Sequence, residues 1–234
     1  MWEPVLDRLA AERDAIALDM PGFGGSPPLA GHAELTPAVL ARAVAEFLDE
    51  LGIERAHLAG NSLGAWVALE LAKLGRGLSV TGLCTAGLWS RPLEPRREAR
   101  RRAGRLLLPL IPALAHSDRG RRFLLGRHVA RPDRVPPRAA ARLARAYLTA
   151  PSYRAASIAM RAGRFSGFER ISVPVTLAWG ELDRVVSRPR NPPPATVRTV
   201  TLPGCGHVPT WDDPEQVSRV LLEAGARATA PSAH

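Results

Sequence analysis

The chain has 234 residues, a formal net charge of +10 and two cysteines. This length suits one α/β domain with an insertion and is enough to bury a sizeable core. The chain does not open with a basic start and an apolar run, which argues against a secretory signal. The longest apolar stretch, residues 106–115, is too short to cross a bilayer. We therefore expect a cytoplasmic protein with free thiols and no membrane span.

The positive charge is concentrated between residues 91 and 170, which hold 20 arginines against 5 acidic residues. A basic segment of this kind could contact nucleic acid or anionic lipid. However, it has few aromatic residues for base stacking and no helix-turn-helix, zinc or RNP pattern. We interpret the arginines as a solvated helical surface and expect no nucleic-acid partner.

Extended and helical patterns alternate along both ends of the chain. Apolar runs bounded by turn residues predict strands, and apolar residues at helical spacing between capping signals predict helices. The predicted strands cover residues 15–19, 56–60, 78–85, 173–179 and 196–202, and the predicted helices cover residues 3–11, 36–51, 65–74 and 213–224. This alternation predicts an α/β fold with a mostly parallel sheet flanked by helices.

A G-x-S-x-G pattern lies where the second predicted strand turns into a helix, at Gly60-Asn61-Ser62-Leu63-Gly64. At such a junction two backbones come close together, so a β-carbon at either glycine is expected to clash. The serine occupies a strained turn with its Oγ projecting, and the helix N-terminus beneath it favours negative charge. The plainer alternative is a small residue at a tight turn.

Two further polar residues follow predicted strands. Residues 173–179 lead into Gly180-Glu181-Leu182-Asp183, and residues 196–202 lead into Pro203-Gly204-Cys205-Gly206-His207. A Ser, an Asp and a His therefore each follow a strand in that order. In this order the chain resembles the α/β-hydrolase superfamily, and Asp19–Ser26 resembles the turn after that family's fourth strand.

The resemblance implies a role for each of these residues. Ser62 is the expected nucleophile, His207 the base and acid, Asp183 the anion that orients the histidine, and the Leu63 N–H one oxyanion donor. Asp183 could instead cap a helix, Glu181 competes with it for the acidic role, and His207 could be an exposed loop residue. Asp183 is preferred over Glu181 because it matches the family's G-x-x-D spacing.

The remaining histidines and the other motifs offer no competing site. His57 lies at the start of its predicted strand, about 16 Å from the serine. The flanking residues of the other histidines match no catalytic motif: His32, His116, His128 and His234. The glycines of residues 22–25 do not open a helix, because Pro27 and Pro28 follow, so a dinucleotide loop is rejected. No metal-binding pattern is present, and we expect neither a metal nor an organic cofactor.

The resemblance further implies two parts: an α/β-hydrolase core, residues 1–90 and 171–234, and an inserted helical cap, residues 91–170. The middle segment is rich in Arg, Ala and Leu and is broken by prolines. Such a cap would cover the serine with apolar walls. The candidates for these walls are residues 106–108, Phe123, Tyr147 and Phe165.

The chain departs from the family in two places. Family members open with strands and a loop that donates a second N–H to the oxyanion, whereas this chain begins just beyond that loop. The family's third strand lies between the fourth strand, here residues 15–20, and the strand at residues 56–60. Without the third strand, these two strands lose a hydrogen-bonded partner or must pair directly with each other. We expect the chain as written to be a fragment. The second departure is the proline-rich stretch after Asp183, where prolines forbid the family's helix.

The expected reaction is hydrolysis of a carboxylic ester through an acyl-serine, with a small-molecule acyl substrate as the partner. A serine at position 62 argues against epoxide-hydrolase and dehalogenase relatives, which the resemblance predicts to use Asp. Two alternatives stay open: carbon–carbon bond hydrolysis with the same three residues, and a truncated protein that is catalytically impaired.

Overall fold

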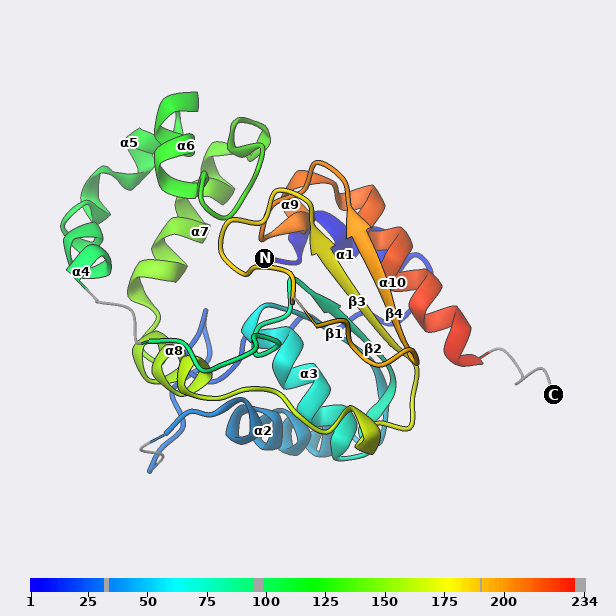
Figure 1. Ribbon diagram of the computed structural model, residues 1–234. Helices are drawn as coiled ribbons and strands as arrows, with labels where there is room; N and C mark the ends of the chain where they lie inside the picture. Colours follow the sequence, from blue (N-terminus) through cyan, green and yellow to red (C-terminus); the bar gives the residue numbers. More distant parts are fainter. Residues whose placement is uncertain (32–33, 95–98, 190, 230–234) are drawn as a thin grey trace.

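The computed structural model describes residues 1–31, 34–94, 99–189 and 191–229. The described part contains one sheet of four parallel strands in the order β1-β2-β3-β4, drawn as adjacent arrows in Figure 1. The strands are β1 (Ala56–Asn61), β2 (Gly77–Leu83), β3 (Val175–Gly180) and β4 (Val197–Leu202). All four were predicted from their apolar runs, and the α/β class is confirmed.

Helices cover both faces of this sheet (Figure 1). α2 (Pro37–Glu50) and α3 (Leu63–Lys73) pack on one face, in a core that includes Leu40, Trp66 and Leu177. α1 (Glu3–Ala10) and α10 (Pro214–Thr229) lie on the other face, in a core that includes Val5, Leu202 and Val217. The four helices predicted from sequence are confirmed, although α10 extends beyond the predicted end at residue 224.

Local chemistry accounts for several of these boundaries. The Thr36 hydroxyl accepts a hydrogen bond from the Val39 N–H at 3.2 Å, which caps the N-terminus of α2. Gly52, at a φ of 68°, follows the C-terminus of α2 in the left-handed conformation that glycine adopts without strain. Every residue of β3 is buried, as expected of an inner strand that is covered on both faces.

The strand predicted at residues 15–19 is wrong. Residues 14–20 form no regular secondary structure, and within the described residues no strand lies beside β1 on the side away from β2. A strand requires a hydrogen-bonded neighbour, and residues 14–20 do not pair directly with β1. Leu18 and Met20 still pack against the core, but Ile16 is 50% exposed.

A third region, between β2 and β3, is mainly helical, and its helices α4 to α8 are drawn to the left of the sheet in Figure 1. Its α-helices are α4 (Ala99–Leu106), α5 (Ile111–Ala115), α6 (Asp118–Leu125), α7 (Pro137–Thr149) and α8 (Tyr153–Ala162), and its 3₁₀ turns are η1 (Leu108–Leu110), η2 (Pro132–Arg134) and η3 (Phe168–Arg170). Apolar residues from α5, α6 and α7 form small cores of their own. We call residues 99–162 the α4–α8 segment.

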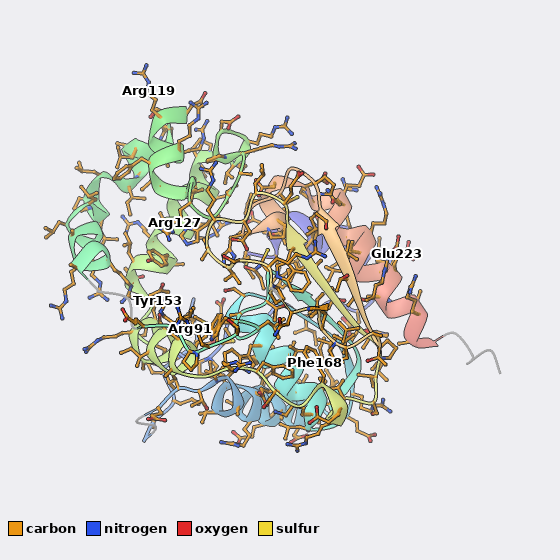
Figure 2. The ribbon with its side chains drawn as sticks, viewed as in Figure 1. Arg91, Arg119, Arg127, Tyr153, Phe168 and Glu223 are labelled. Carbon is orange, nitrogen blue, oxygen red and sulfur yellow. The ribbon has the colours of Figure 1, made fainter. Side chains whose placement is uncertain are left out.

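Most arginines of the α4–α8 segment meet the expectation of a solvated surface. Arg119, for example, projects from α6 away from the molecule (Figure 2). Two arginines do not: Arg101 is 5% exposed and Arg121 is 8% exposed. Arg101 donates to the carbonyl oxygens of Tyr147 and Ala150, so it joins α4 to the end of α7.

No helix among the described residues is long and apolar enough to span a bilayer.

The crossover between β3 and β4 is irregular, as its prolines predict. The described residues between Asp183 and Thr196 form no helix. This crossover is followed, after β4, by the short helix α9 (Pro209–Asp212) and then α10. One loop thus follows the carboxyl end of β3, and a second loop lies between the carboxyl end of β4 and α9.

The two glycines of the G-x-S-x-G pattern have different surroundings. A β-carbon on Gly60 would lie 2.1 Å from the Gly64 carbonyl oxygen and 2.4 Å from the Ala65 nitrogen. A β-carbon on Gly64 would meet no atom within 4 Å outside its own helix. The predicted clash is therefore confirmed for Gly60 and wrong for Gly64, because only Gly60 faces the neighbouring backbone.

This difference predicts opposite effects of two similar substitutions. Gly60→Ala should lower the free energy of unfolding by about 3 kcal/mol or more, because backbone atoms must move to admit the methyl group. Gly64→Ala, its matched control within α3, should leave stability unchanged or raise it by about 0.5–1 kcal/mol. Urea unfolding of both variants measures this, and equal unfolding midpoints would contradict the packing described for Gly60.

Candidate active site

The three residues singled out from sequence follow three parallel strands. Ser62 comes directly after β1, Asp183 follows β3 and His207 follows β4. Because the carboxyl ends of parallel strands meet at one edge of a sheet, all three lie at the same edge. Ligand sites of open α/β sheets form at this edge.

Ser62 has a strained backbone conformation at the turn from β1 into α3. Its φ is 55° and its ψ is −114°, a conformation that costs a non-glycine residue about 1–3 kcal/mol. The surrounding backbone holds it there: the Ser62 N–H donates to the Leu83 carbonyl oxygen at 2.8 Å, and the Ser62 carbonyl oxygen accepts from the Ala86 N–H at 3.2 Å. The strain expected from the sequence pattern is therefore present.

Asp183 and His207 form a buried hydrogen-bonded pair. The Nδ1 of His207 lies 2.9 Å from Oδ2 of Asp183, and the two side chains are 6% and 3% exposed. The other carboxylate oxygen, Oδ1, accepts the N–H groups of Val185 at 2.7 Å and Val186 at 3.0 Å. Because Nδ1 faces a carboxylate, it carries the proton, and Nε2 is left as the basic nitrogen of the neutral ring.

The surroundings of Asp183 keep its carboxylate ionised. Burial alone would raise the pKa of Asp183. The hydrogen bond and the charge of His207, together with the N–H groups of Val185 and Val186, outweigh burial and hold the pKa below its ordinary value. The pair therefore has an anion fixed behind a histidine, the arrangement that stabilises an imidazolium as it forms.

Asn61 connects the β1 turn to the loop that carries the histidine. Its side-chain amide donates to the His207 carbonyl oxygen at 2.8 Å and to the Leu83 carbonyl oxygen at 3.1 Å, and all three groups are buried. Since Ser62 is the next residue, this contact brings the serine and histidine backbones to one place. The Ser62 hydroxyl itself forms no hydrogen bond with any residue that the structure describes.

The N–H of Leu63 stands at the first position of α3, directly after Ser62. N–H groups in the first turn of a helix have no partner within the helix, and the helix dipole favours negative charge beside them. This N–H is therefore available to an anion that forms at the Ser62 side chain.

Glu181, the competitor of Asp183 in the sequence, lies elsewhere. It is exposed and accepts the Gly204 N–H at 2.9 Å. His57 is at the opposite end of β1, with Nδ1 2.9 Å from the Ser79 hydroxyl, and His116 is exposed next to the Pro112 carbonyl oxygen. His32 and His234 lie outside the described residues.

His128, which the sequence did not assign to the site, lies beside His207. Its ring centroid is 6.1 Å from that of His207 and 5.7 Å from that of Tyr147. Tyr147 in turn contacts Tyr153, whose ring centroid is 5.0 Å away, and Figure 2 labels Tyr153 at the start of α8. The rings of His128, Tyr147 and Tyr153 therefore extend from His207 across α7 to α8. Nothing in the local sequence around His128 indicates this contact, which depends on how the α4–α8 segment folds back.

Of the residues expected to form apolar walls, Tyr147 is connected to His207 through the ring of His128. Leu106 is 81% exposed and Phe123 is 68% exposed. Phe165 is buried in the core on the α3 face of the sheet. These three residues do not form a covered apolar wall, because apolar side chains in short helices can face solvent, and sequence spacing does not reveal which face is covered.

Asp212 is a further residue of the site that sequence reasoning missed. It is 4% exposed, and its two carboxylate oxygens accept the Gly206 N–H at 2.7 Å and the Arg131 N–H at 2.8 Å. It thereby ties the loop that carries His207, residues 203–208 (the histidine loop), to the α4–α8 segment. A hydrogen bond from the Val208 N–H to the His128 carbonyl oxygen does the same. An acidic residue just after a loop histidine was the available signal.

Loss of the Asp212 carboxylate should therefore destabilise the protein. Asp212→Asn replaces one acceptor oxygen with an NH₂ group that faces a buried N–H, which should lower the free energy of unfolding by about 1–3 kcal/mol. Asp213→Asn is the matched control, because Asp213 caps α10 through the Gln216 N–H and asparagine caps a helix equally well. Chemical unfolding of both variants compares them, and similarly small losses would contradict the role assigned to Asp212.

One group of described side chains could in principle bind a metal ion. The Cys84 sulfur, a carboxylate oxygen of Asp183 and a ring nitrogen of His207 lie within 4.8 Å of one another. The group suits a metal poorly, because burial, followed by the nearby Asp183 charge, raises the pKa of the Cys84 thiol, and metals bind the thiolate. The His207 Nδ1 is also occupied by Asp183.

The model of the alpha/beta hydrolase family matches residues 1–220. The chain belongs to this family. Its sheet, with helices on both faces and polar residues at the strand ends, is the corresponding fold, so the α/β-hydrolase resemblance seen in the sequence is confirmed.

Several known proteins are similar to this alpha/beta hydrolase. It is 34% identical over 204 residues to the epoxide hydrolase EphH of Mycobacterium tuberculosis, a match covering 80% of this chain and 94% of that one. A shorter match, 49% identical over 57 residues, is to a 2-hydroxy-6-oxo-6-phenylhexa-2,4-dienoate hydrolase of Comamonas testosteroni and covers 24% of this chain and 20% of that one. An esterase from Thermogutta terrifontis has the same fold, with a TM-score of 0.71 and 24% identity over 98% of this chain and 85% of that one.

Proposed function

We propose that the protein is a serine hydrolase that cleaves a carboxylic ester of small to medium size through an acyl-serine. The observation that carries this proposal is the buried hydrogen bond between Asp183 and His207. Asn61 joins the backbone of His207 to the strained turn that holds Ser62. Ser62 is the nucleophile, His207 the base and acid, and Asp183 the orienting anion.

The reaction follows from these roles. His207 Nε2 takes the proton as Ser62 Oγ attacks the ester carbonyl carbon, and the resulting oxyanion accepts the Leu63 N–H. Collapse of this intermediate breaks the bond to the alcohol, which leaves with the proton from Nε2. Water then attacks the acyl-serine, giving its proton to Nε2, and the carboxylic acid is released as Ser62 regains its proton.

The similarity to an epoxide hydrolase does not carry that chemistry to this chain. Opening of an epoxide by a serine hydroxyl would form an ether, which has no carbonyl carbon for water to attack. The enzyme would stop after one turnover, whereas a carboxylate nucleophile forms an ester that water can cleave. Ser62 therefore favours acyl transfer.

Carbon–carbon bond hydrolysis is the second candidate. It is favoured by the local similarity to a dienoate hydrolase. Both reactions require the same nucleophile, base and anion, so the three residues alone do not separate them. The residues that contact the leaving group must therefore distinguish ester cleavage from carbon–carbon bond cleavage.

The α4–α8 segment is the proposed cap of this enzyme, within the span 91–170, and residues 1–90 and 171–234 form the proposed catalytic core. Two hydrogen bonds support this division, because they hold the segment beside His207: the Val208 N–H donates to the His128 carbonyl oxygen, and the Arg131 N–H donates to Asp212 in α9. The row of His128, Tyr147 and Tyr153 would then form the wall beside the substrate.

A substrate panel with intact-mass detection tests the proposal. Aryl esters with two-, four- and eight-carbon acyl groups, a dienoate diketone and an aryl epoxide are each given to the purified protein. Ester turnover with an acyl adduct on the protein is expected. Faster cleavage of the diketone than of every ester would favour the second candidate, and a folded protein that cleaves nothing would refute catalysis.

A further inference from the structure

The carboxyl ends of all four parallel strands carry a residue with reactive or polar chemistry. Ser62 follows β1, Asp183 follows β3 and His207 follows β4, and the proposed mechanism uses all three. Cys84 follows β2, between them at the same edge of the sheet, and the mechanism as described does not use it. Its side chain is completely buried.

Cys84 shares with Ser62 a positive φ, which is uncommon for a residue other than glycine. In the described part of the chain, these two are the non-glycine residues with positive φ, 47° for Cys84 and 55° for Ser62. The Cys84 N–H still donates to the Ala178 carbonyl oxygen at 2.7 Å, so β2 remains paired with β3 up to this point. Strain of this kind gathers at functional sites and requires support from the surroundings.

The sulfur of Cys84 contacts both loops that carry the Asp–His pair. It accepts the Gly180 N–H at 3.5 Å and donates to the Gly206 carbonyl oxygen at 3.6 Å. Gly180 ends β3 three residues before Asp183, and Gly206 immediately precedes His207. The sulfur is also within 4.8 Å of a carboxylate oxygen of Asp183 and a ring nitrogen of His207.

These loops touch each other directly at the same point. A β-carbon on Gly180 would lie 2.1 Å from the Gly206 carbonyl oxygen, so the two backbones are in contact where the sulfur meets them. The thiol joins an N–H on one loop to a carbonyl oxygen on the other. A shift of either loop would lengthen one of these bonds and move Asp183 relative to His207.

The thiol remains protonated in this position. Burial, followed by the charge of Asp183, raises the pKa of Cys84. At neutral pH the group is therefore an S–H donor, and it adds no second negative charge beside the Asp183 carboxylate.

We propose that Cys84 is a positioning residue whose thiol bridges the acid loop and the histidine loop and holds Asp183 and His207 at hydrogen-bond distance. The inference rests on the proposed function, because it assigns Cys84 to the same catalytic pair. Sulfur suits the bridge because distances of 3.5 and 3.6 Å are bonding distances for sulfur, whereas a hydroxyl bonds at about 2.5–3.0 Å.

The matched variants are Cys84→Ala, which removes the bridge, and Cys84→Ser, which keeps a donor and an acceptor with stretched bonds. Cys84→Ala should lower kcat by about 2- to 10-fold, the range expected when a hydrogen bond between neutral groups is lost, with KM unchanged because the thiol does not touch substrate. Cys84→Ser should fall between wild type and Cys84→Ala. Ser79→Ala, which removes a partly buried hydrogen bond near the other end of β2, should leave kcat unchanged.

A spectroscopic measurement reports on the bridge without turnover. The proton that His207 Nδ1 shares with Asp183 gives a far-downfield proton resonance, which should move upfield or broaden in Cys84→Ala and be partly restored in Cys84→Ser. If Cys84→Ala is too unstable to study, Cys84→Gly serves instead, because glycine adopts a φ of 47° without strain.

The outcomes separate the inference from the proposed function. An active wild type with a kcat and a downfield resonance that are the same in Cys84→Ala would overturn the bridge. Serine and alanine variants with equal kcat would also overturn it, because packing alone would treat these small side chains alike. An inactive wild type whose resonance still moves in Cys84→Ala would refute the function and leave the bridge supported.

Discussion

Replacement of Ser62 by alanine should lower kcat/KM for an ester by about 10⁵-fold or more. The hydroxyl is the proposed nucleophile, and removal of the nucleophile from a Ser-His-Asp site costs on the order of 10⁶ in rate in the well-studied proteases. The Asp183–His207 hydrogen bond does not involve Ser62, so Ser62→Ala should fold and retain that pair. Steady-state kinetics with the best ester of the panel measures the loss.

The control for this variant is Ser166→Ala, which changes an exposed serine outside the site and should keep full activity. A circular dichroism spectrum shows whether Ser62→Ala is folded. If the folded Ser62→Ala variant retained more than about a hundredth of the wild-type rate, the rate would have to come from another nucleophile, and the assignment of Ser62 would be wrong.

Asp183→Asn should lower kcat by about 10⁴-fold. An amide NH₂ facing His207 Nδ1 favours the tautomer with the proton on Nε2, so the ring no longer accepts the Ser62 proton. The backbone N–H groups of Val185 and Val186 can still be accepted by the amide oxygen, so the loop should keep its shape. Glu181→Gln is the control, because Glu181 contacts Gly204 rather than the histidine; equal activities of the two variants would refute the role of Asp183.

The same substitution should change stability at acid pH. The pKa of Asp183 is lower in the folded protein than its ordinary value, so its ionised form stabilises the fold. This contribution is complete above the unfolded-state pKa, about 3.9, and is lost as pH falls through the folded-state value. Asp183→Asn should therefore lose less stability than wild type between about pH 5 and pH 2, which denaturant unfolding at several pH values would detect.

Much of the sheet could be predicted because its signals are local. An apolar run that ends in glycine identifies a buried parallel strand and its exit, as in β3 followed by Gly180. Once the strands are parallel, their carboxyl ends share one edge, which is why Ser62, Asp183 and His207 could be grouped. The G-x-x-D spacing also favoured Asp183 over Glu181. Of these two acidic residues, Asp183 contacts His207 and Glu181 contacts Gly204.

The errors concern features that depend on distant parts of the chain. Residues 15–19 have a strand-like composition, but a strand also needs a neighbour, and none of the described strands lies beside them. His128 reaches the site through a contact with His207 that spans many residues, and no local pattern encodes it; Asp212 had a local signal, but its bond to Arg131 is equally distant in the chain. Cys84 was expected only to be a free thiol, because the contacts of its sulfur depend on the positions of Gly180 and Gly206.

The catalytic proposal depends most directly on the reactivity of Ser62. Incubation of the folded wild-type protein with a fluorophosphonate, followed by proteolysis and mass spectrometry, identifies the residue that attacks an acyl-like centre. The account predicts one stoichiometric adduct on Ser62, greatly slowed in His207→Ala. A folded protein that stays unlabelled, or an adduct on another residue with Ser62 unmodified, would contradict it.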